Sequence, residues 1–465
     1  MLRSPVLALL SLTLVATSAP SLAISDLQPE LHPGFRTSPP DLGQAHLSLA
    51  DDTLSQSHLL PRSAFRLLQA RSATEIVAER MAAFARERRA IAERWATKKG
   101  VTLSSEASRF FDAAAAGDSA KVQELFAVLD ARRLPDGRRP ANVKAIWDAI
   151  IDTYGTAFVV ATWPADSLVE YARSVLATVP VGAIYLAGTD PGRFVPGLFN
   201  DLSGTNNCII LTQNALVDPG YLDYVELLHG QRLACISTQD IEQAMQSYSL
   251  DAQRRARHDA ENPRGPRLFQ PDESLQVTPD GKVTSSGLGS IMAVNELLVR
   301  RLVEKNSGIS FYLEETRPMK GLYTDALPAG PLLRLRPPDS ESKALQSRAT
   351  STVELWQSMA TQFRNAKNLP PESPVRMAWS SLARAHGGYF LERKLPTEAE
   401  MILRIALQIS SRNEPAILLL MEHLNAVNRR DEAYSALNRF LRSNPEANPL
   451  LFELRQDLAR QSPPP

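Results

Sequence analysis

Apolar side chains recur every three or four positions in the first clearly patterned part of the chain, which predicts amphipathic helices. Between Thr74 and Gly100 they occupy one helical face, while arginine and glutamate fill the other. Glycine is typical of the position directly after a helix, so Gly100 marks the end of this one. An alanine-rich helix, a turn at Gly117 and a second amphipathic helix follow. We therefore expect residues 63–140 to form an N-terminal helical layer.

Short apolar runs alternate with helical patterns over residues 141–337, the expected α/β domain. The runs that predict buried strands are 181–187, 207–212, 233–236, 309–313 and 332–335. In addition, Asp280-Gly281 predicts a turn between two short strands. Strands that alternate with helices at this spacing are typical of a parallel sheet covered by helices. The predicted fold class is α/β plus all-α: a Rossmann-like, mostly parallel sheet with flanking helices, an N-terminal helical layer and C-terminal helical hairpins.

Two segments near the C-terminus repeat with an offset of 34 residues. The paired positions are Ala399 with Ala433, Leu403 with Leu437, and Ala406 with Phe440. This period is that of tetratricopeptide (TPR) repeats, helical hairpins that stack into a groove for partner peptides or domains. We expect residues 351–461 to form a TPR-like helical domain that binds a protein partner in this groove. A linker over 338–350 precedes it, and 462–465 form a disordered tail.

The N-terminus has the pattern of a secretory signal peptide. Arg3 precedes a short apolar run, and Ser21-Leu22-Ala23 offers the small-x-small sequence that signal peptidase cleaves. The run is too short to cross a bilayer as a helix. We expect residues 1–23 to be removed by cleavage near Ala23, residues 24–62 to be a flexible leader, and the mature chain to be periplasmic or secreted without a transmembrane segment. An uncleaved anchor is the alternative.

Charge and cysteine content narrow the possible functions. Lysine plus arginine and aspartate plus glutamate both number 51, so the formal net charge is zero. Nucleic acids and anionic membrane surfaces need a basic excess, and we expect neither as a partner. The seven histidines lack metal-ligand spacing and the chain carries no cofactor motif, so we expect no metal and no cofactor. Cys208 and Cys235 could form a disulfide in an oxidising compartment, but unpaired buried thiols are the favoured interpretation.

The best position for chemistry is the turn after the first predicted strand, residues 188–194. Ligands collect at the carboxyl ends of parallel strands, where helix N-termini point backbone N–H groups outward. Thr189 and Asp190 are helix-capping types, and Gly192 permits close approach of a ligand. Arg193 could hold a carboxylate or phosphate with two hydrogen bonds. The alternative is structural: Asp-Pro-Gly is a common turn, and Arg193 pairs with a neighbouring acid.

Two other strand ends bring polar side chains to the same edge. Gln213 and Asn214 follow the second predicted strand, while Glu314 and Glu315 follow the strand at 309–313. Adjacent strand residues point to opposite faces, so at most one of the two glutamates faces the site. The candidate ligand-binding residues are therefore Thr189, Asp190, Gly192, Arg193, Gln213, Asn214 and Glu314, and no catalytic residue is identified.

Four parts of the chain carry a resemblance to known proteins: 184–194, 211–216, Asp218 with 221–224, and 311–315. Together with the repeats, they resemble an uncharacterised family of exported bacterial TPR proteins. The strand-and-turn arrangement is also similar to the soluble portion of certain multi-spanning glycosyltransferase-like membrane proteins. This chain lacks their membrane helices, so the resemblance implies fold and export but no sugar transfer.

Two hypotheses for the function follow. The first is an exported interaction or assembly module of the bacterial envelope, which binds a protein partner through its repeats and performs no catalysis. The second is an enzyme or small-ligand domain that binds a sugar, phosphate or carboxylate around residues 188–194. A purely structural envelope protein is a third possibility.

Overall fold

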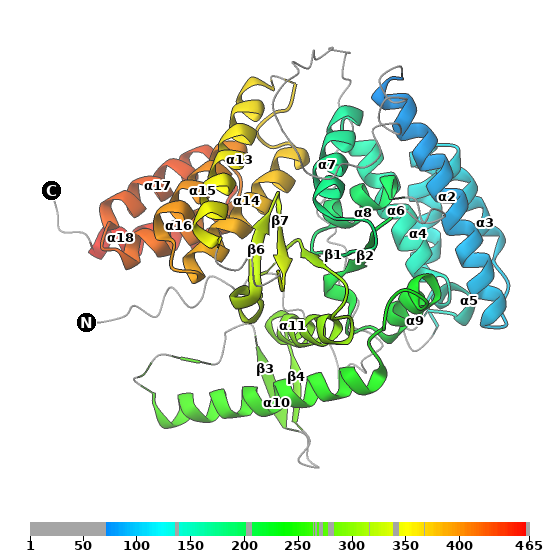
Figure 1. Cartoon of the computed structure of the whole chain (residues 1–465), viewed down its shortest axis with the longest axis horizontal. Coiled ribbons are helices and arrows are strands. Elements are labelled where there is room, and N and C mark those ends of the chain that lie inside the picture. The colour runs from blue at the N-terminus through cyan, green and yellow to red at the C-terminus, as the bar shows by residue number, and fades with distance from the viewer. Residues whose placement is uncertain are drawn as a thin grey trace.

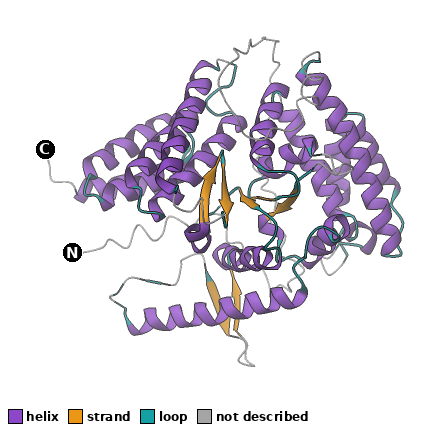
Figure 2. Ribbon diagram, in the orientation of Figure 1, coloured by secondary structure: helices purple, strands orange, loops and turns teal. Residues whose placement is uncertain are grey.

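The computed structural model places a small sheet between two groups of helices (Figure 1). It describes residues 71–134, 139–200, 207–263, 265, 267–268, 273–277, 283–315, 317–337, 344–366 and 368–461. Most of these residues are helical (Figure 2). The predicted signal peptide, leader and tail lie outside the described residues.

The N-terminal helical layer forms as predicted from its apolar periodicity. Its first helix starts with a capping box, in which Ser72 and Glu75 bind each other's backbone N–H. Gly100 and Gly117 follow helices in the left-handed conformation, with φ of 68° and 74°. The helices of this layer are α2 (Ala73–Lys98), α3 (Ser105–Ala115) and α4 (Ser119–Ala131). The next helices lie in the range of the predicted α/β domain: α5 (Ala141–Lys144), α6 (Trp147–Thr162) and α7 (Ala165–Thr178).

The five-stranded sheet is mixed rather than mostly parallel. Its strands, in spatial order, are β2 (Ile209–Thr212), β1 (Ile184–Ala187), β5 (Phe311–Leu313), β7 (Leu332–Leu335) and β6 (Ala326–Ala329). The pairs β1–β2 and β1–β5 are parallel, whereas β5–β7 and β6–β7 are antiparallel. Strand β6 was not predicted. It contains Pro328, and its edge position explains why the sheet tolerates a residue without an N–H group.

The predicted strand at 233–236 is wrong. Leu233 and Ile236 are buried, as the apolar run suggests, but the segment is a loop before α10. The side chain of Asn306 binds both backbone groups of Ala234, accepting from its N–H at 2.8 Å and donating to its carbonyl at 3.0 Å. A side-chain amide therefore supplies the hydrogen bonds that a neighbouring strand would have given.

The α-helices and the hairpin between the strands agree with the sequence pattern, apart from their bounds, whereas the two short 3-10 helices η4 (Gln213–Ala215) and η5 (Lys320–Asp325) were not predicted. The first helix after β1 begins at Asp190, with Thr189 as its N-cap. The other elements between the strands are α8 (Asp190–Phe199), α9 (Pro219–His229), α10 (Thr238–Glu261), β3 (Ser274–Val277), β4 (Val283–Ser286) and α11 (Leu288–Lys305). Strands β3 and β4 pair antiparallel, while the predicted turn at 280–281 between them lies outside the described residues.

The C-terminal helices pack side by side (Figure 1). They are α13 (Leu345–Asn365), α14 (Pro374–Glu392), α15 (Pro396–Ile409), α16 (Glu414–Ala426), α17 (Arg430–Ser443) and α18 (Pro449–Gln461). Lys394 and Asn428 lie 34 residues apart, between α14 and α15 and between α16 and α17, and both have φ of 61°. Ala399 and Ala433, at the same offset, are fully buried. The two hairpins therefore repeat in conformation as well as in sequence.

Helix α14 is bound directly to the sheet. Tyr389 donates a hydrogen bond to the carbonyl of Ala326 in β6 at 2.6 Å. His386 accepts from the indole N–H of Trp356 at 2.9 Å and donates through Nε2 to the carbonyl of Leu332 in β7 at 3.1 Å. Burial lowers the pKa of His386 to about 4, so the ring is neutral at pH 7. One continuous hydrophobic core therefore joins the sheet to the first helical hairpin.

Candidate functional site

The turn between β1 and α8 has the conformation of an anion-binding site. Thr189 caps α8, because its Oγ1 accepts a hydrogen bond from the N–H of Gly192 at 3.1 Å. The backbone N–H groups of Gly188 and Thr189 point to a single place in front of the helix, where a negative charge is favoured by the helix dipole.

The carboxylate of Glu314 occupies that place. Its Oε2 accepts from the N–H of Gly188 at 3.2 Å and from the hydroxyl of Tyr185 at 2.8 Å. Its Oε1 accepts from the hydroxyl of Thr189 at 2.6 Å, and Tyr171 adds a longer hydrogen bond at 3.3 Å. Glu314 is 2% exposed. The chain itself thus supplies the anion that this turn can bind.

Two features support the close fit of Glu314. A side chain at Gly192 would overlap its carboxylate, so only glycine allows this approach. Burial raises the pKa of Glu314, and the hydrogen bonds from Thr189 and Tyr185 offset only part of this effect. Every donor around this carboxylate is neutral.

Arg193 lies next to Gly192 in sequence but points away from Glu314. Its Nε and Nη2 donate to Oδ1 of Asp152 in α6, at 3.0 and 2.6 Å. This contact agrees with the structural alternative, in which Arg193 pairs with a neighbouring acid. Asp190 is exposed at the start of α8. Among the candidate residues, Thr189, Gly192 and Glu314 therefore meet, whereas Asp190 and Arg193 do not join them.

Gln213 and Asn214 lie at the same edge of the sheet, at the end of β2. The amide of Asn214 donates to the carbonyl of Gly188 at 3.4 Å, next to the Glu314 site. Asn295 of α11, which the sequence did not single out, donates to the carbonyl of Asn214 at 3.4 Å. Gln213 is fully buried, and neither atom of its amide has a partner among the described residues. Buried amides that lack a hydrogen-bond partner from the protein are typical sites for ordered water.

Glu315 points to the opposite side of β5 from Glu314, as the alternation of strand side chains predicts. It accepts hydrogen bonds from the N–H of Met319 at 2.7 Å and from the hydroxyl of Tyr323 at 2.6 Å. Burial raises the pKa of Glu315 to about 7. The two glutamates therefore serve separate sites.

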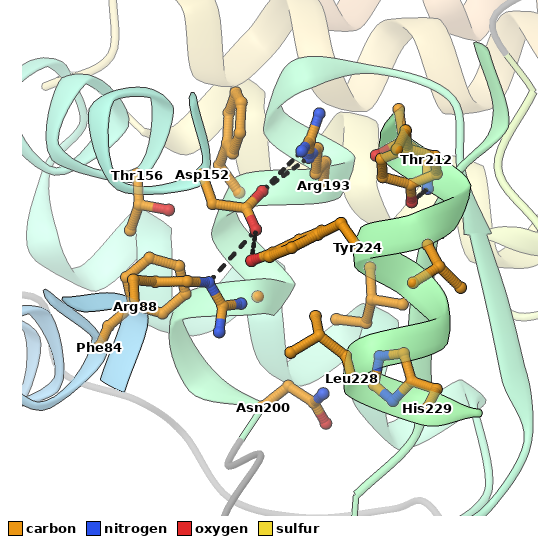
Figure 3. A pocket seen from close by; sticks show the side chains of 15 residues that line it. Phe84, Arg88, Asp152, Thr156, Arg193, Asn200, Thr212, Tyr224, Leu228 and His229 are labelled. Carbon is orange, nitrogen blue, oxygen red and sulfur yellow. Dashed lines mark hydrogen bonds and ion pairs between the residues drawn. The ribbon is translucent and has the colours of Figure 1, made fainter. Parts of the chain in front are cut away.

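A pocket of about 40 Å³ lies on the Arg193 side of α8 (Figure 3). Asp152 is at its centre: Oδ2 accepts from the hydroxyl of Tyr224 at 3.0 Å and lies 3.2 Å from Nε of Arg88. Burial alone would raise the pKa of Asp152, but Arg193 and Arg88 hold it below its usual value. Burial also lowers the pKa of His229, on the pocket wall, to about 4.

Sequence reasoning missed Arg88 and Asp152, although one signal was present. Met81, Phe84 and Ile91 form the buried face of α2, and Arg88 falls on that same face at helical spacing. A charged residue in an apolar stripe needs a buried partner, which here is Asp152. The position of that partner, 64 residues later in α6, cannot be read from the pattern.

Other expectations concern cysteines, metals and membranes. Cys208 and Cys235 are both free, but only Cys208 is buried as expected, whereas Cys235 is half-buried. Burial raises the pKa of Cys208 to about 12. Within the described ranges, no group of three or more histidine, cysteine, aspartate or glutamate side chains could hold a metal ion. No helix in the described part of the chain has both the length and the apolar character to cross a bilayer.

Comparison with known proteins does not assign the chain to a family. No family model, no curated protein and no solved structure matches it. The resemblance to exported bacterial TPR proteins and to glycosyltransferase-like membrane proteins therefore stays a prediction from the sequence.

Proposed function

We propose that this protein is exported and acts as a non-catalytic interaction or assembly module of the bacterial envelope. The TPR-like helices α16–α18 hold a protein partner, and the Rossmann-like part of the chain supports them. The observation that carries this proposal is the repeated helical hairpin with its buried alanine positions.

The repeat extends to the hydrogen bonds of the turns. The N–H of Leu395 donates to the carbonyl of Phe390 at 2.9 Å, and 34 residues later the N–H of Arg429 donates to that of Leu424 at 2.8 Å. Stacked hairpins of equal geometry give an extended surface without a deep pocket, which suits a peptide or a protein rather than a small substrate.

The strand-end site gives less support to an enzyme or a small-ligand domain. Glu314 engages the N–H groups and hydroxyls of the β1–α8 turn, and Asp152 engages Arg193. A sugar, phosphate or carboxylate at this turn would have to displace a buried carboxylate that accepts several hydrogen bonds. The interaction module is therefore the better supported function.

The docking of α14 on the sheet restricts where a partner binds. Most of α14 is buried, and Arg384 donates to the carbonyl of Glu315 at 3.3 Å. On α16, Leu419 packs towards Gly388 of α14, and Glu422, one turn later, is exposed. We therefore assign the partner to the face of α16 that carries Glu422, and to the part of α18 that continues this face.

Site-specific photo-cross-linking in the full chain tests this assignment. A photoreactive residue replaces Glu422 on α16 in one variant and Arg439, exposed on α17, in the matched control. We expect a discrete cross-linked species from Glu422 in intact cells and none from Arg439. Equal products from both positions, or none from Glu422, would contradict the proposal.

A further inference from the structure

The pocket beside Arg193 contains more positive than negative side chains. Its wall comes from α2, α6, α8, β2 and α9. The charged residues in this wall are two arginines, Arg88 and Arg193, and one acid, Asp152. His229, the remaining titratable base of the wall, is buried and neutral at pH 7.

Asp152 cannot satisfy both arginines fully. Its Oδ1 accepts two hydrogen bonds from Arg193, and its Oδ2 accepts one from Tyr224. Arg88 reaches the same Oδ2 only through Nε, at 3.2 Å and without hydrogen-bond geometry. The terminal nitrogens of the Arg88 guanidinium point away from the Asp152 carboxylate (Figure 3), and Arg88 is part of the pocket wall.

Arg88 is nevertheless deeply buried. It is 6% exposed, and its guanidinium lies 4.3 Å from the ring centre of Phe84. Its Nη1 has no hydrogen-bond partner among the described residues. The nearest second carboxylate belongs to Glu87, which is 3.7 Å from Nη1, is 28% exposed at its side chain, and lies outside the pocket wall. A buried cation with a free donor is costly unless another acceptor is present.

A second unpartnered donor lies in the same wall. Thr156 is fully buried, and its hydroxyl has no partner among the described residues. Figure 3 shows its oxygen turned towards the Arg88 and Asp152 side chains. The apolar residues Phe84, Val225 and Leu228 complete the wall. The pocket thus combines a cation, a hydroxyl donor and apolar surface in a volume suited to a very small ligand.

We infer that this pocket binds a small monovalent anion, of the size of chloride, nitrate or formate, between the Arg88 guanidinium and the Thr156 hydroxyl. The volume of about 40 Å³ suits an ion of this size and excludes a sugar or a nucleotide. Asp148 also faces Arg193, but burial raises its pKa to about 7, so it offsets the positive charge only in part at neutral pH. This inference does not depend on the proposed partner-binding function.

Thermal unfolding of the full chain tests this inference. Sodium formate and sodium nitrate are titrated against sodium gluconate at equal ionic strength, because gluconate is too large for the pocket. We expect formate and nitrate, but not gluconate, to raise Tm by about 1–2 °C for each tenfold increase in concentration above Kd. Arg88→Met should remove this difference between anions, and Thr156→Val should reduce it. Arg86→Met, the same change at an exposed position of α2, should leave it intact.

Crystals of the wild-type chain grown in bromide give a readout that does not depend on the variants. We expect an anomalous peak in the pocket, next to the Arg88 guanidinium. An equal response of Tm to formate, nitrate and gluconate would overturn the inference, as would bromide peaks at the protein surface only. If Arg88→Met does not fold, Thr156→Val and the bromide peak still decide the outcome.

Discussion

Helix α8 separates two buried carboxylates that are held in opposite ways. Glu314, beside Gly192, is surrounded by neutral donors from the backbone, two tyrosines and a threonine. Asp152, on the other side, faces two arginines and one tyrosine. The pKa of Glu314 is raised because burial outweighs neutral hydrogen bonds, whereas that of Asp152 is lowered because the arginine charges outweigh burial. Burial alone therefore does not decide the charge of a carboxyl group.

The comparison predicts that loss of the Asp152 charge is the more damaging change. Asp152→Asn removes the carboxylate that faces both buried arginines, Arg88 and Arg193, and we expect the free energy of unfolding to fall by about 3–5 kcal/mol. Urea denaturation measures this loss. Asp112→Asn is the control, because Asp112 pairs with Arg89 while its side chain is 64% exposed, and should cost less than about 1 kcal/mol. Equal losses of unfolding free energy in the two variants would contradict the special contribution of the buried Asp152 charge.

Truncation of Glu314 should be less costly and should be reversible by a ligand. Glu314→Ala leaves several neutral donors without an acceptor, and we expect a loss of about 2–3 kcal/mol. Acetate added to this variant should restore part of the stability, because it can replace the missing carboxylate at the helix N-terminus. The measurement is Tm with acetate against Tm with gluconate. Equal responses to acetate in the variant and the wild type would show that the turn does not bind an anion.

Substitutions at the two glycines of α8 test whether the close approach of Glu314 contributes to stability. Gly192→Ala should lower stability by about 1–3 kcal/mol, because the added methyl group overlaps the Glu314 carboxylate. Gly197→Ala is the matched control: nothing lies within 4 Å of its added carbon, and we expect no loss or a gain of about 0.5 kcal/mol. Both variants are compared by urea denaturation. A similar effect of the two substitutions would show that the close approach of Glu314 is not required.

The smallest expected effect is a pH dependence of opposite sign at the two carboxyl groups. The folded-state pKa of Asp152 is depressed, so its stabilising contribution is present above its ordinary pKa and is lost on acidification. The folded-state pKa of Glu314 is raised, so its contribution is present below its ordinary pKa and is lost as pH rises through the folded value.

Unfolding at pH 3.5 to 8 measures both contributions. The difference between wild type and Asp152→Asn should shrink towards acid, and that between wild type and Glu314→Gln should shrink towards alkaline pH. If both stability differences shrink in the same direction of pH, the contrast between the Asp152 and Glu314 carboxyl groups is contradicted.

Long periodic patterns allowed the helices to be predicted, whereas short apolar runs did not define strands reliably. The segment at 233–236 is buried like a strand, but Asn306 takes the place of the neighbouring strand, and this contact depends on α11. Strand β6 was not predicted, and it contains Pro328, which a sheet tolerates at its edge. Edge position follows from the sheet order, which the sequence does not contain.

The candidate site was predicted in its location but not in its chemistry. Thr189, Gly192 and Glu314 were expected at one edge of the sheet, and they meet there. The sequence could not show that Glu314 would enter the turn, because this requires the pairing of β1 with β5, more than 120 residues apart. It also could not show that Arg193 would turn to Asp152, since that depends on how α6 packs against α8.

The bonds from α14 to the sheet have a mechanical consequence. Tyr389 and His386 of α14 donate hydrogen bonds to backbone carbonyls of β6 and β7. These bonds attach the C-terminal helices to the two strands. A pull exerted on α18 passes through the packed helices α17 to α15 and reaches the β6–β7 hairpin. Such a pull would also reach the neighbourhood of α8, because Trp379 of α14 packs against Tyr171, which donates a hydrogen bond to Glu314.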